Sequence, residues 1–161
     1  MDKFNIILPT ALDWHVSGVG GAIATVIRTW GSAPRPVGSQ LAVSGEGDII
    51  GSVSGGCVEG AVIIEALNTL KTGKNIILEY GVSDEDAFAV GLACGGNIQI
   101  LVEPIGFGLS ESTLTELIHR CQRKEAVAYS IDINSGVNKL ISWDINTVKK
   151  CLFFWHNISA K

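Results

Sequence analysis

Four glycine-rich segments interrupt the sequence and limit the length of every helix or strand that can form between them. Glycine accounts for 19 of the 161 residues, whereas about 7% is usual in proteins. The segments are Gly18–Gly21, Gly31–Gly38 (which also contains two prolines), Ser54–Gly60 and Cys94–Gly96. Because they recur at no fixed interval, they indicate loops between short elements and not a repeat architecture.

The stretches between these loops carry the hydrophobic patterns of both helices and strands. Apolar residues at helical spacing predict helices over residues 4–17, 58–70 and 114–121. Strand patterns cover residues 22–30, 39–44, 49–53, 75–80, 98–103, 127–133 and 137–143. We expect Ser54 or Gly56 to cap the second helix, and Thr113 to form a capping box with Glu116 at the third. Two hairpins, over residues 39–53 and 127–143, are expected. Combined with helical crossovers, they predict the α/β class, with a mixed sheet and flanking helices in a single domain over residues 1–161.

Composition and charge exclude several classes of protein. The chain is 47% hydrophobic and 17% charged, which is typical of a compact globular protein. Its net charge of −4 and the lack of a basic run argue against nucleic acid as a partner. No apolar stretch approaches the ~20 residues of a membrane span, and the N-terminus lacks the order of a signal peptide. We therefore expect a cytoplasmic protein in which all four cysteines are free thiols.

The segment Gly31–Gly38 is the first candidate for a ligand-binding loop. Arg35 lies between two prolines, so its backbone is stiff and its guanidinium is presented in a form that pairs well with phosphate oxygens. The hydroxyl of Ser32 can add a hydrogen bond, and Arg28 in the preceding strand can supply a second cation. The same composition also fits a proline-rich connector with an exposed arginine, and the sequence leaves both interpretations open.

Two loops combine a cysteine with paired glycines. Cys57 follows Gly55–Gly56 where a helix is expected to begin, so free N–H groups can attract an anion and favour the thiolate. Cys94 precedes Gly95–Gly96 at the edge of a strand. If both loops line one cleft, two thiolates face one ligand, which suits a thiophilic metal or sulfur transfer. A buried cysteine in a plain glycine turn is the alternative for each loop.

Three further residues are weaker candidates. Glu59 falls in the first turn of the expected second helix, where helix capping explains a carboxylate. Glu103 precedes Pro104 and is expected to end a strand. Cys121 lies on the apolar face of the third helix and is expected to pack in the core.

Three of these segments follow one another in a definite order: Gly31–Gly38, then Ser54–Glu59, then Cys94–Gly96 with Val102–Pro104. In this order they resemble the XdhC/CoxI family of maturation factors for xanthine dehydrogenase and related molybdenum hydroxylases. The resemblance implies that the chain binds molybdenum cofactor (molybdopterin), assists its sulfuration by a cysteine desulfurase and delivers it to a xanthine dehydrogenase-type enzyme. The implied cofactor-binding residues are Ser32, Arg35, Gly55, Gly56, Cys57, Cys94, Gly95 and Gly96. Cys57 and Cys94 are the implied contacts to molybdenum.

The resemblance covers roughly residues 10–105, and many family members carry a further Rossmann-like domain after this one. We expect a single domain without that addition, completed by a homodimer or by a separate Rossmann-like chain. The family role implies an accessory protein and not an enzyme. Two alternatives stay open: a sulfurtransferase-like accessory enzyme that uses Cys57, and a non-catalytic interaction domain that uses the apolar tail Leu152–Trp155.

Overall fold

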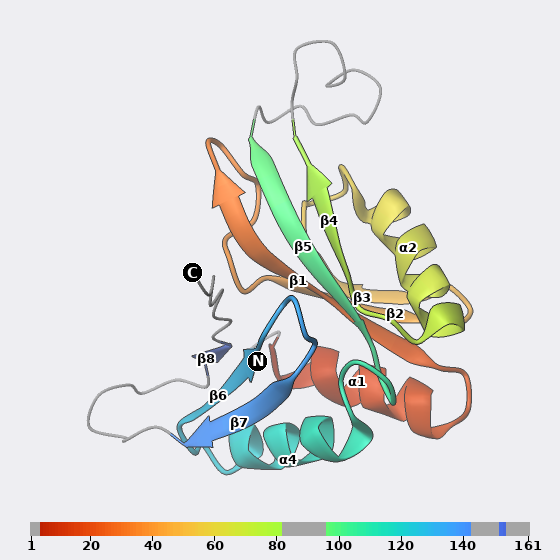
Figure 1. Ribbon diagram of the computed structural model, residues 1–161, viewed down its shortest axis with the longest axis vertical. Coiled ribbons are helices and arrows are strands. Elements are labelled where there is room, and N and C mark those ends of the chain that lie inside the picture. Colours follow the sequence, from red (N-terminus) through yellow and green to blue (C-terminus); the bar gives the residue numbers. More distant parts are fainter. Residues whose placement is uncertain (1–3, 82–95, 143–151, 154–161) are drawn as a thin grey trace.

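The computed structural model describes residues 4–81, 96–142 and 152–153, which form two sheets flanked by helices (Figure 1). The described helices are α1 (Phe4–Val16), α2 (Glu59–Thr72) and α4 (Glu111–Gln122). The larger sheet has the order β3-β2-β1-β5-β4 and contains β1 (Gly21–Trp30), β2 (Gln40–Ser44), β3 (Ile49–Gly51), β4 (Ile76–Tyr80) and β5 (Asn97–Pro104). The smaller sheet has the order β7-β6-β8 and contains β6 (Val127–Ile131), β7 (Asn138–Ser142) and β8 (Leu152–Phe153).

The strand pairing confirms the α/β class that the sequence predicts. Neighbouring strands of the larger sheet are antiparallel, and both expected hairpins are present, as β2–β3 and β6–β7. Parallel pairing occurs in the smaller sheet, between β6 and β8. Among the described helices, none combines the length and the apolar character needed to cross a membrane.

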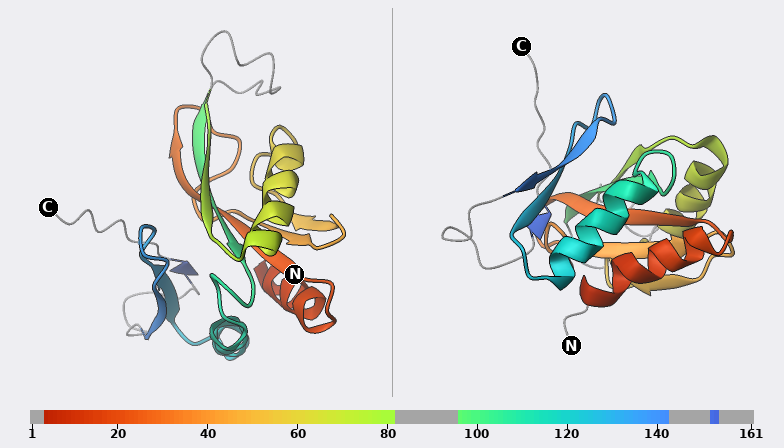
Figure 2. Two further views of the ribbon diagram at one scale, coloured as in Figure 1. Left: turned by 45° about the vertical axis from the view of Figure 1, so that its right-hand side comes forward. Right: turned by 90° about the horizontal axis from the view of Figure 1, so that it is seen from below.

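β1 is the central strand of the larger sheet, and its residues contribute to two separate cores. Ala22, Ala24 and Val26 pack with α2, and we call this cluster the α2-side core. Ile23 and Ile27 point to the opposite face and pack with residues of α1 and α4. The alternation follows from the two-residue period of a strand. Figure 2 shows α2 against one face of the sheet, with α1 and α4 side by side at its lower end.

The start of α4 differs from the prediction. Ser110, and not Thr113, is the N-cap residue, because its hydroxyl accepts a hydrogen bond from the N–H of Thr113 at 3.1 Å. The sequence pattern favours Thr113 because Glu116 follows three residues later, whereas Ser110 has no acidic residue at that spacing. The helix therefore begins at Glu111, three residues before the predicted start.

Replacing Ser110 with alanine is expected to lower the free energy of unfolding by about 1 kcal/mol, since the N–H of Thr113 loses its acceptor. Thr113→Ala is the matched variant, because it removes the hydroxyl that the sequence pattern indicates, and it should cost less. Urea unfolding of both variants measures the difference. A larger loss for Thr113→Ala would contradict the assignment of Ser110 as the cap.

The two ends of α2 are built differently. Its N-cap residue is Val58, whose side chain makes no capping hydrogen bond, so the prediction that Ser54 or Gly56 caps this helix is wrong. At the other end, Gly73 adopts a φ of 68° and donates its N–H to the carbonyl of Thr69 at 2.8 Å, as a glycine at this position predicts.

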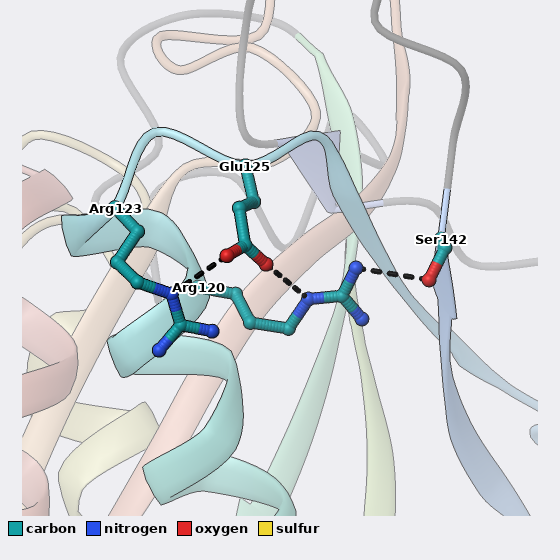
Figure 3. Close-up of polar contacts among 4 residues, drawn as sticks. All are labelled: Arg120, Arg123, Glu125 and Ser142. Atoms are coloured by element: carbon teal, nitrogen blue, oxygen red, sulfur yellow. Dashed lines mark hydrogen bonds and ion pairs between the residues drawn. The ribbon is translucent and has the colours of Figure 1, made fainter.

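The C-terminal end of α4 is linked to the smaller sheet by polar contacts, of which the one between Arg120 and Glu125 is part-buried (Figure 3). The Nε of Arg120 donates to Glu125 at 3.1 Å, and its Nη2 donates to the hydroxyl of Ser142 at 2.9 Å. The Nε of Arg123 donates to the other oxygen of Glu125 at 2.6 Å. Ion pairs near the surface usually contribute little to the free energy of unfolding. We therefore expect these contacts to orient the end of α4 and to add little to stability.

Candidate functional site

The segments that the sequence singles out gather at one end of the larger sheet. Trp30 at the end of β1 pairs with Asn97 at the start of β5, and Tyr80 at the end of β4 pairs with Ile98. α2 leads through a short connection into β4 and runs antiparallel to it, so its N-terminus lies at this same end (Figure 1). The loop after β1, the loop before α2 and the entry to β5 therefore share one edge of the fold.

Gly96 lies directly against the loop that follows β1. A Cβ atom built on Gly96 would lie 2.8 Å from the backbone N of Ala33, 2.8 Å from the carbonyl O of Trp30 and 2.9 Å from the carbonyl C of Ser32. Real Cβ atoms almost never come this close to backbone atoms. Only glycine fits this contact, which joins the end of the Cys94–Gly96 segment to the Gly31–Gly38 loop.

The Gly31–Gly38 loop is irregular, as its prolines predict, and it presents polar side chains to solvent. Ser32 and Arg35 are both exposed. The loop is anchored at its end, where the N–H of Gly38 donates to the carbonyl of Val26 at 2.8 Å. Beside it on β1, the guanidinium of Arg28 lies 5.3 Å from the centre of the Trp30 ring, which is 40% exposed. Arg28 and Arg35 are thus both available cations at this end of the sheet.

The loop before α2 is organised around the carboxylate of Glu59, which is only 8% exposed. Its Oε1 accepts hydrogen bonds from the Ser52 hydroxyl at 2.8 Å, the Val53 N–H at 3.2 Å and the Ser54 N–H at 2.9 Å. Its Oε2 accepts from the Gly56 N–H at 2.8 Å and from the Ser54 hydroxyl. Burial by itself raises the pKa of this carboxyl, but the hydrogen bonds from Ser54, Ser52 and its own N–H outweigh burial and lower the pKa to about 2.

These hydrogen bonds change the interpretation of two residues. The sequence explains Glu59 by helix capping, yet three of the N–H groups that its carboxylate accepts, those of Val53, Ser54 and Gly56, belong to residues that precede the helix. The N–H groups of the Gly55–Gly56 segment are also already used, since Gly56 donates to Glu59 and Gly55 donates to the Ser52 hydroxyl at 2.9 Å. The carboxylate of Glu59, at the start of α2, is therefore the anion that these loop donors bind.

Cys57 is a free, half-buried cysteine between this loop and α2. It packs against the α2-side core, as does Ala33 from the Gly31–Gly38 loop. Cys94 and Gly95 lie outside the described residues, so a cleft with two facing thiolates stays a prediction. Within the described part of the chain, no group of three or more His, Cys, Asp or Glu side chains could hold a metal ion.

One prediction about the cysteines is wrong. Cys121 is disulfide-bonded, although a cytoplasmic location leads to the expectation of four free thiols. Its partly buried side chain packs against the core shared by α1 and α4, as its position on the apolar helix face predicts.

Glu103 is a second buried carboxyl that the sequence assigns to a strand end. It is 3% exposed, on β5, and the hydroxyl of Tyr129 on β6 donates to its Oε1 at 2.7 Å. Burial raises the pKa of Glu103 to about 7, against the weaker opposing effect of the Tyr129 hydrogen bond. The hydrogen bond between Tyr129 and Glu103 joins the two sheets. Because Glu103 lies near the end of β5 remote from Asn97, it is not part of the loops that contain Cys57 and Cys94.

A cavity of about 750 Å³ also lies away from these loops. Its lining includes His15, Phe107, Glu111 and Glu116. None of these four residues stands out in the sequence as a candidate for binding.

Comparison with known proteins agrees with the family that the sequence resembles. Residues 14–81 match the model of the XdhC and CoxI family. The chain is 32% identical over 131 residues to the molybdenum cofactor insertion chaperone PaoD of Escherichia coli (strain K12), which covers 81% of this chain and 40% of that protein. It is 32% identical over 107 residues to a probable xanthine dehydrogenase subunit of Bacillus subtilis (strain 168), covering 65% of this chain and 32% of that protein.

A solved structure shares the fold. The crystal structure of a xanthine dehydrogenase from Bacillus halodurans matches with a TM-score of 0.63 and 24% sequence identity, over 74% of this chain and 36% of that chain. This chain therefore spans 40% or less of the length of each of these relatives. Residues 14–81, which carry the Gly31–Gly38 loop and the Ser54–Glu59 loop, are thus similar to the XdhC and CoxI family.

Proposed function

We propose that this chain binds the molybdenum cofactor as cargo and takes part in its insertion into a xanthine dehydrogenase-type enzyme. The observation that carries the proposal is the meeting of the candidate loops at one end of the larger sheet, where Gly96 packs against Ser32 and Ala33. The names of the relatives, a cofactor insertion chaperone and a xanthine dehydrogenase subunit, support the same cargo and the same kind of partner.

The groups available at this end fit such a cargo. A terminal phosphate needs cations, and the exposed guanidinium of Arg35 lies there with that of Arg28 nearby. A thiophilic metal, or sulfur bound to it, suits the free thiol of Cys57. We propose Ser32, Gly55, Gly56, Gly95, Gly96 and Cys94 as further contacts, with Cys94 as a second thiol toward molybdenum.

The finer steps are proposals of the same kind. Sulfuration of the bound cofactor requires a sulfur donor, for which a cysteine desulfurase is the proposed partner. A second copy of the chain or a Rossmann-like chain is proposed to complete the binding site. In this scheme the chain is an accessory protein located in the cytoplasm.

Anaerobic titration with molybdenum cofactor tests the proposal. We expect saturable binding by the wild type, and a loss of affinity of roughly 10- to 100-fold in Arg35→Ala, the cost of removing a charge-assisted hydrogen bond. Cys57→Ala and the double variant with Cys94→Ala should retain less cofactor. Arg123→Ala is the matched control, because it removes an exposed arginine at the far end of α4.

Two results would contradict the proposal. The first is no binding by the wild type, either alone or at concentrations where it forms a dimer. The second is equal binding by the Arg35→Ala and Arg123→Ala variants together with unchanged retention in the cysteine double variant.

A sulfurtransferase-like role is the second candidate, because the thiol of Cys57 is free and only half-buried. It requires a persulfide on Cys57 after incubation with a cysteine desulfurase and cysteine. Peptide mass spectrometry without added sulfur on Cys57 would exclude this role.

A further inference from the structure

We propose that Glu59 is a positioning residue, whose carboxylate serves as a built-in anion that shapes the Ser52–Cys57 loop and holds Cys57 in place for the cargo. The part that concerns the cargo rests on the function proposed above. The part that concerns the loop stands on the geometry of the chain itself.

The first step of the argument is the direction of the hydrogen bonds. A capping side chain accepts N–H groups from the first turn of its own helix. The carboxylate of Glu59 accepts its own N–H but also turns back and accepts the N–H groups of Val53, Ser54 and Gly56, which all precede α2. Most of its N–H donors therefore lie in the loop, and the carboxylate organises the loop more than it caps the helix.

The second step is the position of Cys57 between two anchored neighbours. The N–H of Gly56, on one side, donates to Oε2 of Glu59. The N–H of Val58, on the other side, donates at 2.9 Å to the hydroxyl of Ser54, which in turn donates to Oε2 of Glu59. The backbone of Cys57 is thus held from both sides by contacts that end on one carboxylate.

The third step is that the arrangement needs a carboxylate and not merely a polar side chain. Donors from Ser52, Val53, Ser54 and Gly56 converge on two oxygens, and an ionised carboxylate has acceptor sites on both. A glutamine has one oxygen, and its NH₂ group would face an N–H or a hydroxyl donor. The chain can wrap the carboxylate because Gly55 and Gly56 have φ values of 77° and 116°, which side chains disfavour.

A consequence concerns the anionic part of the cargo. Because the N–H groups of Val53, Ser54 and Gly56 are already paired with Glu59, they are not free to bind a phosphate. Among the described residues, the exposed cations Arg35 and Arg28 are available partners for a phosphate.

The experiment compares Glu59→Gln and Glu59→Ala with the wild type by NMR hydrogen exchange of the loop N–H groups and by titration with the cofactor. We expect exchange at Ser54 and Gly56 to rise roughly tenfold or more in both variants, as for a lost hydrogen bond to a charged acceptor. Sodium formate should restore protection in Glu59→Ala, whereas formamide, which is neutral, should not. Glu46→Gln, an exposed isosteric change, is the control and should leave the loop unchanged.

The outcomes separate this inference from the function on which it rests. Unchanged exchange in Glu59→Gln, or equal rescue by formate and formamide, overturns the role of Glu59 whatever the cofactor does. Loss of loop protection with wild-type cofactor affinity overturns the positioning of Cys57. Absence of cofactor binding in the wild type overturns the proposed function, while the exchange data still decide whether Glu59 organises the loop.

If Glu59→Gln does not fold, Ser52→Ala tests the same contact, because it removes one donor to the carboxylate and should raise exchange at Gly55.

Discussion

Replacing Gly96 with alanine is expected to lower the free energy of unfolding by about 1–3 kcal/mol, the usual cost of forcing an atom into a close-packed site. The added methyl group would lie under 3 Å from backbone atoms of Trp30, Ser32 and Ala33, which cannot rotate away as a side chain can. The Gly31–Gly38 loop must therefore move, and Arg35 moves with it. Urea unfolding measures the stability, and cofactor affinity reports the displaced loop.

Gly60→Ala is the matched control for this change. Gly60 lies in α2, is exposed, and a Cβ built on it meets no atom within 4 Å. Alanine there should stabilise the protein by about 0.5–1 kcal/mol, because glycine loses more backbone freedom on folding. A Gly96→Ala variant as stable as the wild type, with chemical shifts of the loop unchanged, would contradict the close contact.

Glu103 is expected to make the protein less stable as the pH rises. Its pKa is about 7 in the folded chain against an ordinary value of 4.5, so the folded state binds more protons than the unfolded state between these values. The contribution of this group to stability is therefore fully present below the lower pKa, falls through this window and is lost above pH 7. The shift corresponds to a decrease of at most about 3 kcal/mol in the free energy of unfolding as the pH rises. Glu103→Gln should remove most of this pH dependence.

Urea unfolding of the wild type and Glu103→Gln at pH 5 and pH 8 measures this loss as a difference of differences, in which other titrating groups cancel. Glu46→Gln, at an exposed position, is the control and should keep the pH dependence of the wild type. Equal pH dependence in wild type and Glu103→Gln would show that another group titrates.

Local patterns are sufficient to predict most of the fold. The apolar run of β1, the two hairpins and the glycine at the end of α2 depend on neighbouring residues, so a single sequence carries them. The predicted start of α4 is wrong because Ser110 and Thr113 both carry cap-forming hydroxyls, and the acidic residue favours the wrong one. Choosing between them needs the packing of the helix on α1, which local spacing does not contain.

The sequence predicts which residues belong to the candidate site, but it does not predict the contacts that they make with one another. The sequence marks the loops through glycine, proline and cysteine, and the antiparallel pairing of β1 with β5 brings Gly96 against Ser32. The role of Glu59 cannot be read from the sequence because its partners depend on how the loop bends back. Similarly, Glu103 meets Tyr129 from 26 residues away, and only the packing of the two sheets joins them.

The donors of the loop before α2 bind the carboxylate of Glu59, which lies seven residues or fewer along the chain from each of them. A tethered group has an effective concentration of roughly millimolar or more, whatever the surrounding solution contains. Free phosphate and other cellular anions therefore compete poorly for the same donors. The shape of the loop is therefore expected to be independent of the ionic content of the surrounding solution. Under the proposed function, the loop has this shape both with and without the cofactor.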